Sequence, residues 1–222
     1  MLAVLYDIHG NLVAPDEVLK DAHAAGADEY LLGGDFGMGS PWPMETLERL
    51  LAVPNSTWIR GNGERWLREP PLDRPDVVQA LAEMDSGVGT WEGWLYSLQP
   101  HVELDGVLYT HGSPLSDVES FPPDADAGDE RLLNGVRDKT VVFGHSHLQF
   151  RRRGPHDTTL INPGSAGMPL DGDTRAAYAL RRDDGEFEFR RVEYDVERAA
   201  SAWERLPGWG TQVAQRIRRG SD

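Results

Sequence analysis

The chain has 222 residues, no cysteine and a formal net charge of −15. This length favours a single domain over residues 1–222, and the 39% of hydrophobic residues are enough to form a buried core. The absence of cysteine excludes disulfides and thiolate metal ligands, so a metal site would have to use His, Asp, Glu or Asn. The net charge disfavours stable binding to nucleic acid, and we expect none.

The amino-terminal segment MLAVLYDIHG is apolar but lacks a basic start and a cleavage site, so it is interpreted as a strand and not as a signal peptide. No stretch approaches the length of a membrane span. We therefore expect a soluble, cytoplasmic protein without membrane contact. Because the net charge would repel a phosphate ester, such a substrate would need metal ions or a few arginines nearby.

Predicted strands and helices alternate through the first sixty residues. Apolar runs predict strands over 2–7, 29–35 and 56–62, and helical spacing predicts helices over 15–26 and 44–52. This alternation is typical of a parallel sheet with helices packed on it. Residues 64–100 have a mainly helical pattern.

The second half of the chain carries hairpin-type strands. A hairpin is predicted over 102–112 with its turn at Asp105-Gly106, followed by a loop over 120–130, a helix over 129–138 and a strand over 140–147. The segments QFRRR, TTLINPG, AAYALRR and EFEFRRVEYD follow as strands, and a last helix begins near Val196. The arginines of QFRRRG (149–154) are expected to face solvent and are too few to indicate nucleic-acid binding.

Five predicted strands end on side chains that can bind metal. These side chains are Asp7, His9, Asp35, Asn62, His111, His145 and His147. In an open α/β sheet, binding sites form outside the carboxyl ends of the strands, so the seven are expected to gather in one place. Asp7 and His9 are two residues apart, which in an extended chain points both to the same face, and His145 and His147 repeat this spacing.

Seven nitrogen and oxygen ligands are too many for one zinc ion and suit two divalent ions that share a carboxylate, for which Asp35 is the candidate. Two ions roughly 3.5–4 Å apart clamp the oxygens of a phosphoryl group and lower the pKa of a bridging water. A single D-x-H or GGD is most often meaningless, but four of the seven histidines in the chain occupy these positions. The other three, His23, His101 and His156, are interpreted as structural or surface residues.

These motifs, in this order, resemble those of the calcineurin-like metallophosphoesterases. The matching segments are DIHGN (7–11), GGD (33–35), GNGE (61–64), THGSP (110–114) and GHSH (144–147), and NPGSAGMP (162–169) resembles a segment of the small bacterial branch. The resemblance implies an α/β fold, a four-layer αββα sandwich of two mixed β-sheets flanked by helices. It also implies a metal-dependent phosphoric ester hydrolase, either a phosphodiesterase or a phosphatase.

The resemblance implies a role for each ligand. Asp7, His9 and His147 would hold the first ion, Asn62, His111 and His145 would hold the second, and Asp35 would bridge the two. The cofactors would be two divalent metal ions such as manganese, iron, zinc or nickel, among which nitrogen and oxygen ligands discriminate weakly. The substrate would be a phosphate ester, with nucleotides among the candidates.

Gly63 departs from the family pattern. Many members have a histidine here that protonates the leaving oxygen, and general acid catalysis contributes about 10²–10⁴ in rate. The catalytic acid is therefore unassigned, and we expect hydrolysis of phosphodiesters or activated esters by direct attack of a metal-bound hydroxide. A second possibility is that His23, His101 or His156 supplies the proton from another direction.

Several residues beside the motifs are candidates for substrate contact, and each could equally be structural. They are Asn11, Trp42, Arg60, Arg65, Trp66, Ser113 and Asp117. The two arginines suit bidentate contact with a phosphate. The two tryptophans could stack on a nucleobase, although a core position is the stronger interpretation. A short chain without a large insertion predicts a fairly open site.

Two other functions compete with the phosphoesterase hypothesis. A non-catalytic member of this fold could be a metal-binding scaffold for protein interactions, but scaffold relatives tend to lose ligands, and all seven are present here. A metal-dependent hydrolase of a non-phosphate ester or amide would share the dimetal chemistry but not this order of motifs.

Overall fold

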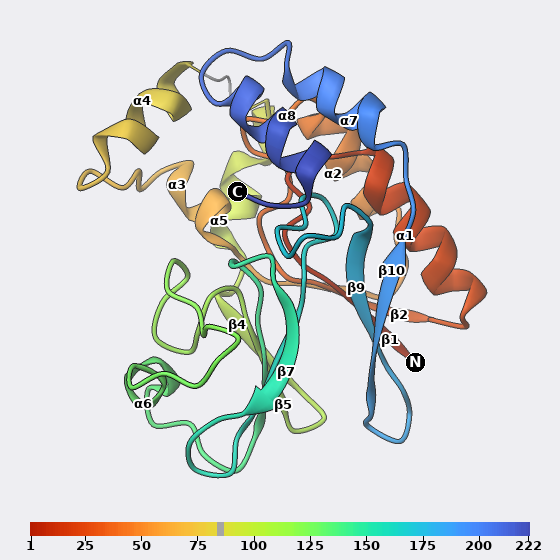
Figure 1. Ribbon diagram of the computed structural model, residues 1–222, viewed down its shortest axis with the longest axis vertical. Helices are drawn as coiled ribbons and strands as arrows, with labels where there is room; N and C mark the ends of the chain where they lie inside the picture. Colours follow the sequence, from red (N-terminus) through yellow and green to blue (C-terminus); the bar gives the residue numbers. More distant parts are fainter. Residues whose placement is uncertain (84–86) are drawn as a thin grey trace.

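The computed structural model describes residues 1–83 and 87–222 and contains two five-stranded sheets (Figure 1). The first sheet consists of β1 (Leu2–Leu5), β2 (Glu29–Leu32), β3 (Ser56–Trp58), β9 (Ala176–Arg181) and β10 (Phe187–Val192), in the order β10-β9-β1-β2-β3. β1, β2 and β3 are parallel, as the alternating pattern predicts, and β9 and β10 are added in antiparallel fashion.

The second sheet consists of β4 (His101–Leu104), β5 (Val107–Thr110), β6 (Thr140–Val142), β7 (Gln149–Arg153) and β8 (Thr159–Pro163), in the order β4-β5-β6-β8-β7. The three central strands are parallel and both edge strands are antiparallel. The hairpin between β4 and β5 turns at Asp105 and Gly106, both with positive φ, as predicted. Both sheets are therefore mixed.

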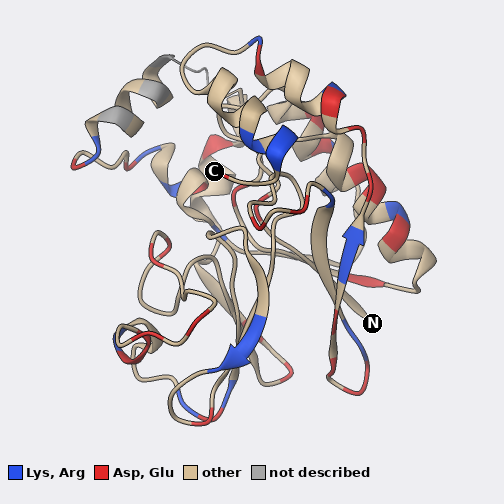
Figure 2. Cartoon of the chain, in the orientation of Figure 1, with Lys and Arg blue, Asp and Glu red and all other residues tan. Residues whose placement is uncertain are grey.

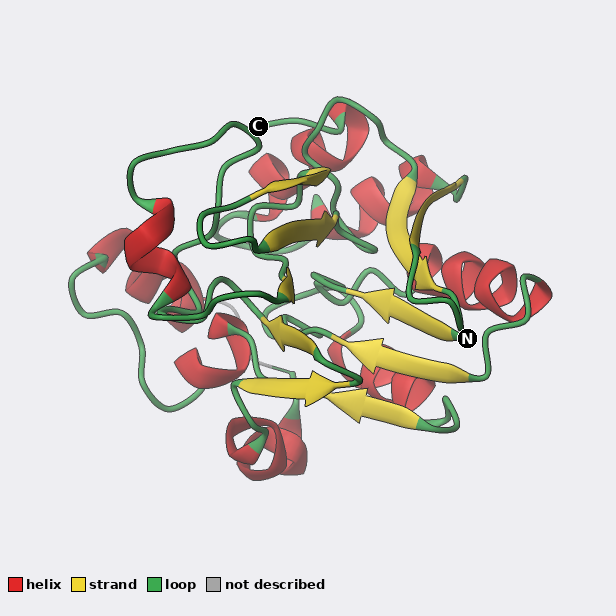
Figure 3. Cartoon of the chain, turned by 90° about the horizontal axis from the view of Figure 1, so that it is seen from below, coloured by secondary structure: helices red, strands yellow, loops and turns green. Residues whose placement is uncertain are grey.

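Helices lie outside the strands (Figure 3). They are α1 (Val13–Ala24), α2 (Pro43–Leu51), α3 (Asn62–Trp66), α4 (Pro75–Glu83), the 3₁₀ turn η1 (Gly89–Trp91), α5 (Glu92–Ser97), α6 (Asp129–Leu133), α7 (Val196–Trp203) and α8 (Gly210–Arg219). In the described parts of the chain, no helix is long and apolar enough to cross a membrane.

Alternating side chains separate the layers. In β1, Leu2 and Val4 pack against Val142 and Ile161 of the second sheet, which places this cluster between the sheets. Ala3 and Leu5 belong instead to the cluster formed with α1 and α2 on the outer face. On the second sheet, Val141 and Leu160 pack outward with α6. The predicted αββα sandwich is confirmed. Its physical reason is that successive side chains of a strand point to opposite faces, so each sheet has an apolar face on both sides.

Several predicted element boundaries are wrong. β1, β2, β3 and β6 end at Leu5, Leu32, Trp58 and Val142, two to five residues before the boundaries expected from the sequence. The helix expected over 129–138 ends at Leu133, because Asn134 takes a left-handed conformation that closes it. The helical region over 64–100 is divided into α3, α4, η1 and α5, and its residues 84–86 lie outside the described residues. The last predicted helix is a pair, α7 and α8.

The arginines of β7 and β10, prominent in Figure 2, are largely paired with carboxylates. Arg190 contacts Asp21, and Arg191 contacts Asp171. The expectation that the QFRRR arginines face solvent is wrong for Arg152, which is 11% exposed and donates two hydrogen bonds of 2.7 and 2.8 Å to Asp129, itself 2% exposed. This pair fixes the start of α6 on the outer face of the second sheet.

Replacing Arg152 with Met is expected to destabilise the protein by about 3–5 kcal/mol, because Asp129 would remain buried without its cationic partner. The measurement is the free energy of unfolding by chemical denaturation. Arg153→Met in the next, exposed position is the matched control and should change stability by no more than about 0.5 kcal/mol. Equal effects of the two substitutions would contradict a structural role for the buried pair.

Candidate metal centre

The structure brings all seven predicted ligands to one edge of the two sheets. Asp7 and His9 follow β1, Asp35 follows β2, and Asn62 is the first residue of α3 after β3. His111 follows β5, and His145 and His147 follow β6. β1, β2 and β3 are parallel in one sheet, and β5 and β6 are parallel in the other. The loops that follow their carboxyl ends contribute to one site.

Most of the ligand positions have left-handed backbone. The φ angles are 54° at Asp7, 49° at His9, 55° at Asp35, 66° at His145 and 60° at His147. The prediction that Asp7-x-His9 and His145-x-His147 are extended is therefore wrong. Such conformations cost about 1–3 kcal/mol each in non-glycine residues and are concentrated at functional sites. Backbone hydrogen bonds hold the turn, with the His9 amide donating to the Asp35 carbonyl at 2.8 Å.

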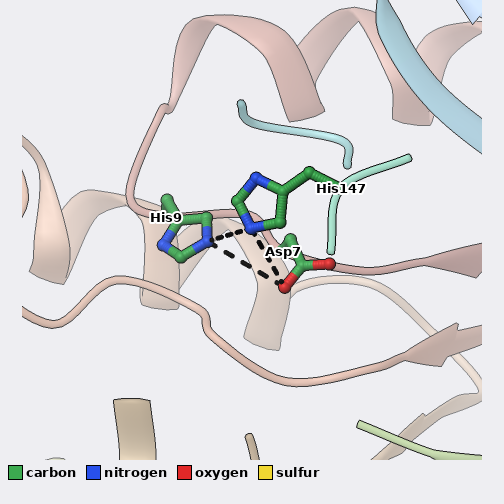
Figure 4. A group of neighbouring side chains, drawn as sticks. All are labelled: Asp7, His9 and His147. Atoms are coloured by element: carbon green, nitrogen blue, oxygen red, sulfur yellow. Dashed lines mark hydrogen bonds and ion pairs between the residues drawn. The ribbon is translucent and has the colours of Figure 1, made fainter. Parts of the chain in front are cut away.

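Asp7, His9 and His147 form the first group of donor atoms (Figure 4). The Nε2 atoms of His9 and His147 lie 3.0 Å apart, and His147 Nε2 lies 3.5 Å from Asp7 Oδ1. His147 Nδ1 donates to the Met168 carbonyl at 2.6 Å, which leaves the lone pair on Nε2. Met168 belongs to the NPGSAGMP segment, so this segment orients a predicted ligand.

Asn62, His111 and His145 form the second group. The Asn62 side-chain amide lies 3.0 Å from His111 Nε2 and 2.9 Å from His145 Nδ1. His111 Nδ1 donates to the Gly33 carbonyl at 2.9 Å. The His145 backbone amide donates to Asp7 Oδ2 at 2.9 Å, which connects the second group to the first.

Asp35 lies between the two groups. Its Oδ2 atom is 3.9 Å from His9 Nε2, and its Oδ1 atom is 3.5 Å from His111 Nε2. Oδ1 also accepts a 2.7 Å hydrogen bond from the Gly63 amide, which orients the carboxylate. One carboxylate thus presents a different oxygen to each group, the arrangement that a shared ligand needs.

Two buried carboxylates, Asp7 and Asp35, dominate the charge of the site. Asp7 Oδ1 is buried without a hydrogen-bond partner in the described residues. Burial, opposed in part by His111, raises the pKa of Asp7 to about 7. Although burial opposes it, the neighbouring carboxylates raise the pKa of His111 to about 10, so the metal-free site keeps a proton there. Burial lowers the pKa of His145 to about 4. This donor set fits a divalent cation, which would replace that proton.

The comparisons with known proteins agree with this geometry. Residues 1–184 match the calcineurin-like phosphoesterase superfamily domain. The chain belongs to this superfamily. The uncharacterised protein MJ0912 of Methanocaldococcus jannaschii is 28% identical over 94% of this chain and 95% of its own length.

Two solved structures share the fold over almost the whole chain. The metallophosphoesterase of Sphaerobacter thermophilus is 24% identical, with a TM-score of 0.79 over 99% of this chain and 98% of its own. The hypothetical protein PH1004 of Pyrococcus horikoshii is 20% identical, with a TM-score of 0.82 over 100% of both chains. The matched superfamily domain ends before β10, α7 and α8 begin, whereas these two structures extend over them.

Glu64 is a site residue that the sequence analysis did not identify. It is 1% exposed, and its carboxylate accepts hydrogen bonds of 2.8–2.9 Å from the backbone amides of Asp35, Phe36 and Gly61. It therefore joins the Asp35 loop to the Asn62 turn. The signal was present, because a Glu three residues after the residue that precedes a helix is typical of a capping box.

A cavity of about 430 Å³ adjoins the proposed ligands. Proposed ligands form part of its lining, and α7, α8 and the segment between them contribute four further residues: Trp203, Trp209, Val213 and Arg216. Figure 1 shows α7 and α8 beside the loops at the carboxyl ends of the strands. Trp66 lines this cavity, whereas Trp42 does not.

The other candidates have structural contacts. Arg65 forms a bidentate ion pair with Asp117 at 2.6 and 2.8 Å, and Arg60 donates to the Tyr96 carbonyl, so neither arginine lines the cavity. Ser113 bonds Ser116 within the loop after His111. Asn11 is fully buried and donates to the Gly167 carbonyl. None of the described residues His23, His101 and His156 lines the cavity.

Binding of Mn²⁺ to the metal-free protein is expected to release protons at pH 7, because a histidine ligand must be neutral and the pKa of His111 is raised to about 10. Titration calorimetry in buffers of different ionisation enthalpy measures the number of protons released per metal ion bound. His111→Asn should release about one proton fewer, whereas the exposed control His101→Asn should release the same number as the natural protein. A binding heat independent of the buffer would contradict the proton–metal exchange.

Proposed function

We propose that this protein is a dimetal-dependent phosphoesterase that hydrolyses phosphodiesters or activated phosphate esters. The observation that carries the proposal is the convergence of seven ligand-type side chains beside a cavity, in a chain of the calcineurin-like superfamily. Each of the seven has a nitrogen or oxygen atom within 3.5 Å of a nitrogen or oxygen atom of another member of the set.

In this proposal Asp7, His9 and His147 hold one divalent ion, Asn62, His111 and His145 hold the other, and Asp35 bridges them. Two such ions clamp the oxygens of a phosphoryl group and lower the pKa of a water molecule. Protein groups fix these ligands: carbonyls of Gly33 and Met168 orient two imidazoles, and Glu64 fixes the loops that carry Asp35 and Asn62. Manganese is the ion that we propose to use first in assays.

Among the described residues that line the cavity, every histidine is a proposed ligand, so none is free to protonate the leaving group. Gly63 lines the cavity without a side chain. Glu64 also lines it, but both carboxylate oxygens accept backbone N–H bonds. The enzyme is therefore expected to prefer esters whose leaving groups are weak bases.

The test is the hydrolysis of a series of aryl phosphodiesters by the Mn²⁺-loaded protein, with leaving groups of graded pKa. We expect kcat/KM to fall steeply as the leaving-group pKa rises, because no general acid compensates. Asn62→Ala should abolish most of the turnover, and Asn55→Ala, at an exposed turn outside the site, should not. Bound metal without turnover of any phosphate ester would support a scaffold role instead, and a flat dependence with chemistry limiting would contradict the missing acid.

Replacing Gly63 with His tests the missing acid directly, but the structure requires a control. A Cβ atom at residue 63 would lie 2.9 Å from Asp35 Oδ1, so any side chain disturbs the proposed bridging carboxylate. Gly63→His should therefore be compared with Gly63→Ala, which has the same Cβ but no acid. We expect the His variant to hydrolyse alkyl phosphodiesters about 10²-fold faster than the Ala variant. Equal rates would mean that position 63 is not where a proton is needed.

A further inference from the structure

The cavity beside the proposed metal ligands has an aromatic side. Three of the seven tryptophans of the chain line it: Trp66 of α3, Trp203 of α7 and Trp209 before α8. Met168 and Val213 add apolar surface. The volume of about 430 Å³ is in the range of cavities that enclose small organic ligands. The site is therefore larger and more apolar than a phosphoryl group alone requires.

Two of these tryptophans offer the cavity ring surface and not a hydrogen-bond donor. The indole Nε1 atoms of Trp66 and Trp203 are buried and have no hydrogen-bond partner in the described part of the chain. Both residues line the cavity, so the surface that they offer a ligand is mainly aromatic carbon. This surface suits a flat ring that can stack on it. A simple alkyl ester has no such ring.

The same cavity contains one guanidinium. Among the described lining residues, Arg216 of α8 is the only lysine or arginine. It is 44% exposed and forms a 2.8 Å ion pair with Asp222. Arg216 lines the same cavity as the proposed ligand His9, which places its charge at this site. In a chain of net charge −15, it gives an anionic substrate a local attraction.

The helices that carry these residues are fixed to the ligand loops. We refer to residues 196–219, which comprise α7 and α8, as the C-terminal cap. Met168, whose carbonyl orients His147, packs in one cluster with Trp203 and Val213. The Gly172 amide donates to the Gly220 carbonyl at 2.7 Å, directly after α8. The cap is therefore held beside the site in the free protein, so little ordering is needed when a ligand binds.

We propose that the C-terminal cap makes this site selective for phosphate esters that carry a nucleobase, with the base against the tryptophans and an anionic oxygen near Arg216. This proposal rests on the proposed phosphoesterase function and adds the substrate class. A base offers a flat ring face that can stack on the tryptophan rings. Specificity would then come from a part of the chain outside the matched superfamily domain.

The experiment compares adenosine 5′-monophosphate with ribose 5-phosphate, which lacks the base, as ligands of the full-length Mn²⁺-loaded protein. Dissociation constants are measured by titration calorimetry and by tryptophan fluorescence. We expect the nucleotide to bind at least about tenfold more tightly, which is the scale of stacking of one base on an aromatic side chain. Trp209→Leu should remove most of this difference and leave ribose 5-phosphate binding unchanged.

Three further variants make the test specific. Trp203→Phe keeps a ring at this position and should retain most of the preference for the nucleotide. Arg216→Gln should weaken both ligands. Trp91→Leu is the control, because Trp91 packs against Trp94 and does not line the cavity. Melting temperatures check that each variant folds.

The outcomes separate the two proposals. Equal affinity for the two ligands would overturn the base-binding role of the cap. Unchanged nucleotide binding in the Trp209→Leu variant would also overturn it, and because Trp209 is only half-buried this substitution should leave the fold intact. If aryl phosphodiesters are still hydrolysed, the phosphoesterase function stands without it. Base-dependent binding without turnover of any phosphate ester would instead support the base-binding role of the cap and contradict the proposed catalytic function.

Discussion

The burial of two carboxylates among the lone pairs of imidazole and amide groups is the constraint on which this structure depends. Asp7 is fully buried and Asp35 is 7% exposed, and the side chains around them are mainly electron-pair donors. Such a cluster is stable only with a positive charge at its centre. In the metal-free protein a proton on His111 serves this purpose, and a divalent cation would do so more completely.

The side chains of this cluster lie on turns that follow the strands, and not on the strands themselves. β1, β2 and β6 end before the ligand residues, and left-handed turns then direct Asp7, Asp35 and His145 toward a common point. Packing of the two sheets offsets the cost of these conformations. Glu64 connects two of the loops through three backbone amides, so the Asp35 and Asn62 positions depend on each other.

The C-terminal helices supply apolar surface to the site. The ligand loops supply charge and polar atoms, whereas α7, α8 and the segment between them supply indole and aliphatic surface. Most acidic residues lie away from this place, on the helices and turns of Figure 2, and several arginines of β7 and β10 are paired with them. The negative net charge is therefore compatible with an anionic ligand, because Arg216 and any cation bound by the proposed ligands would set the field at the site locally.

The sequence by itself determined the strands, the helices packed on them and the set of side chains at the centre. Apolar runs identified strands of a parallel sheet and of later hairpins, and the resemblance of the ordered motifs to a known family implied the two-sheet sandwich. Polar residues after five strands identified where those strands meet. The sequence did not predict the element boundaries or the backbone angles, because no local pattern distinguishes an extended Asp7 from a left-handed one. The pairing of Arg152 with Asp129 and of Arg65 with Asp117 joins residues far apart in the chain. Only the tertiary structure placed Trp203, Trp209 and Arg216 beside ligands that precede them by more than fifty residues, because helix packing against the site, and not any local pattern, brings them there.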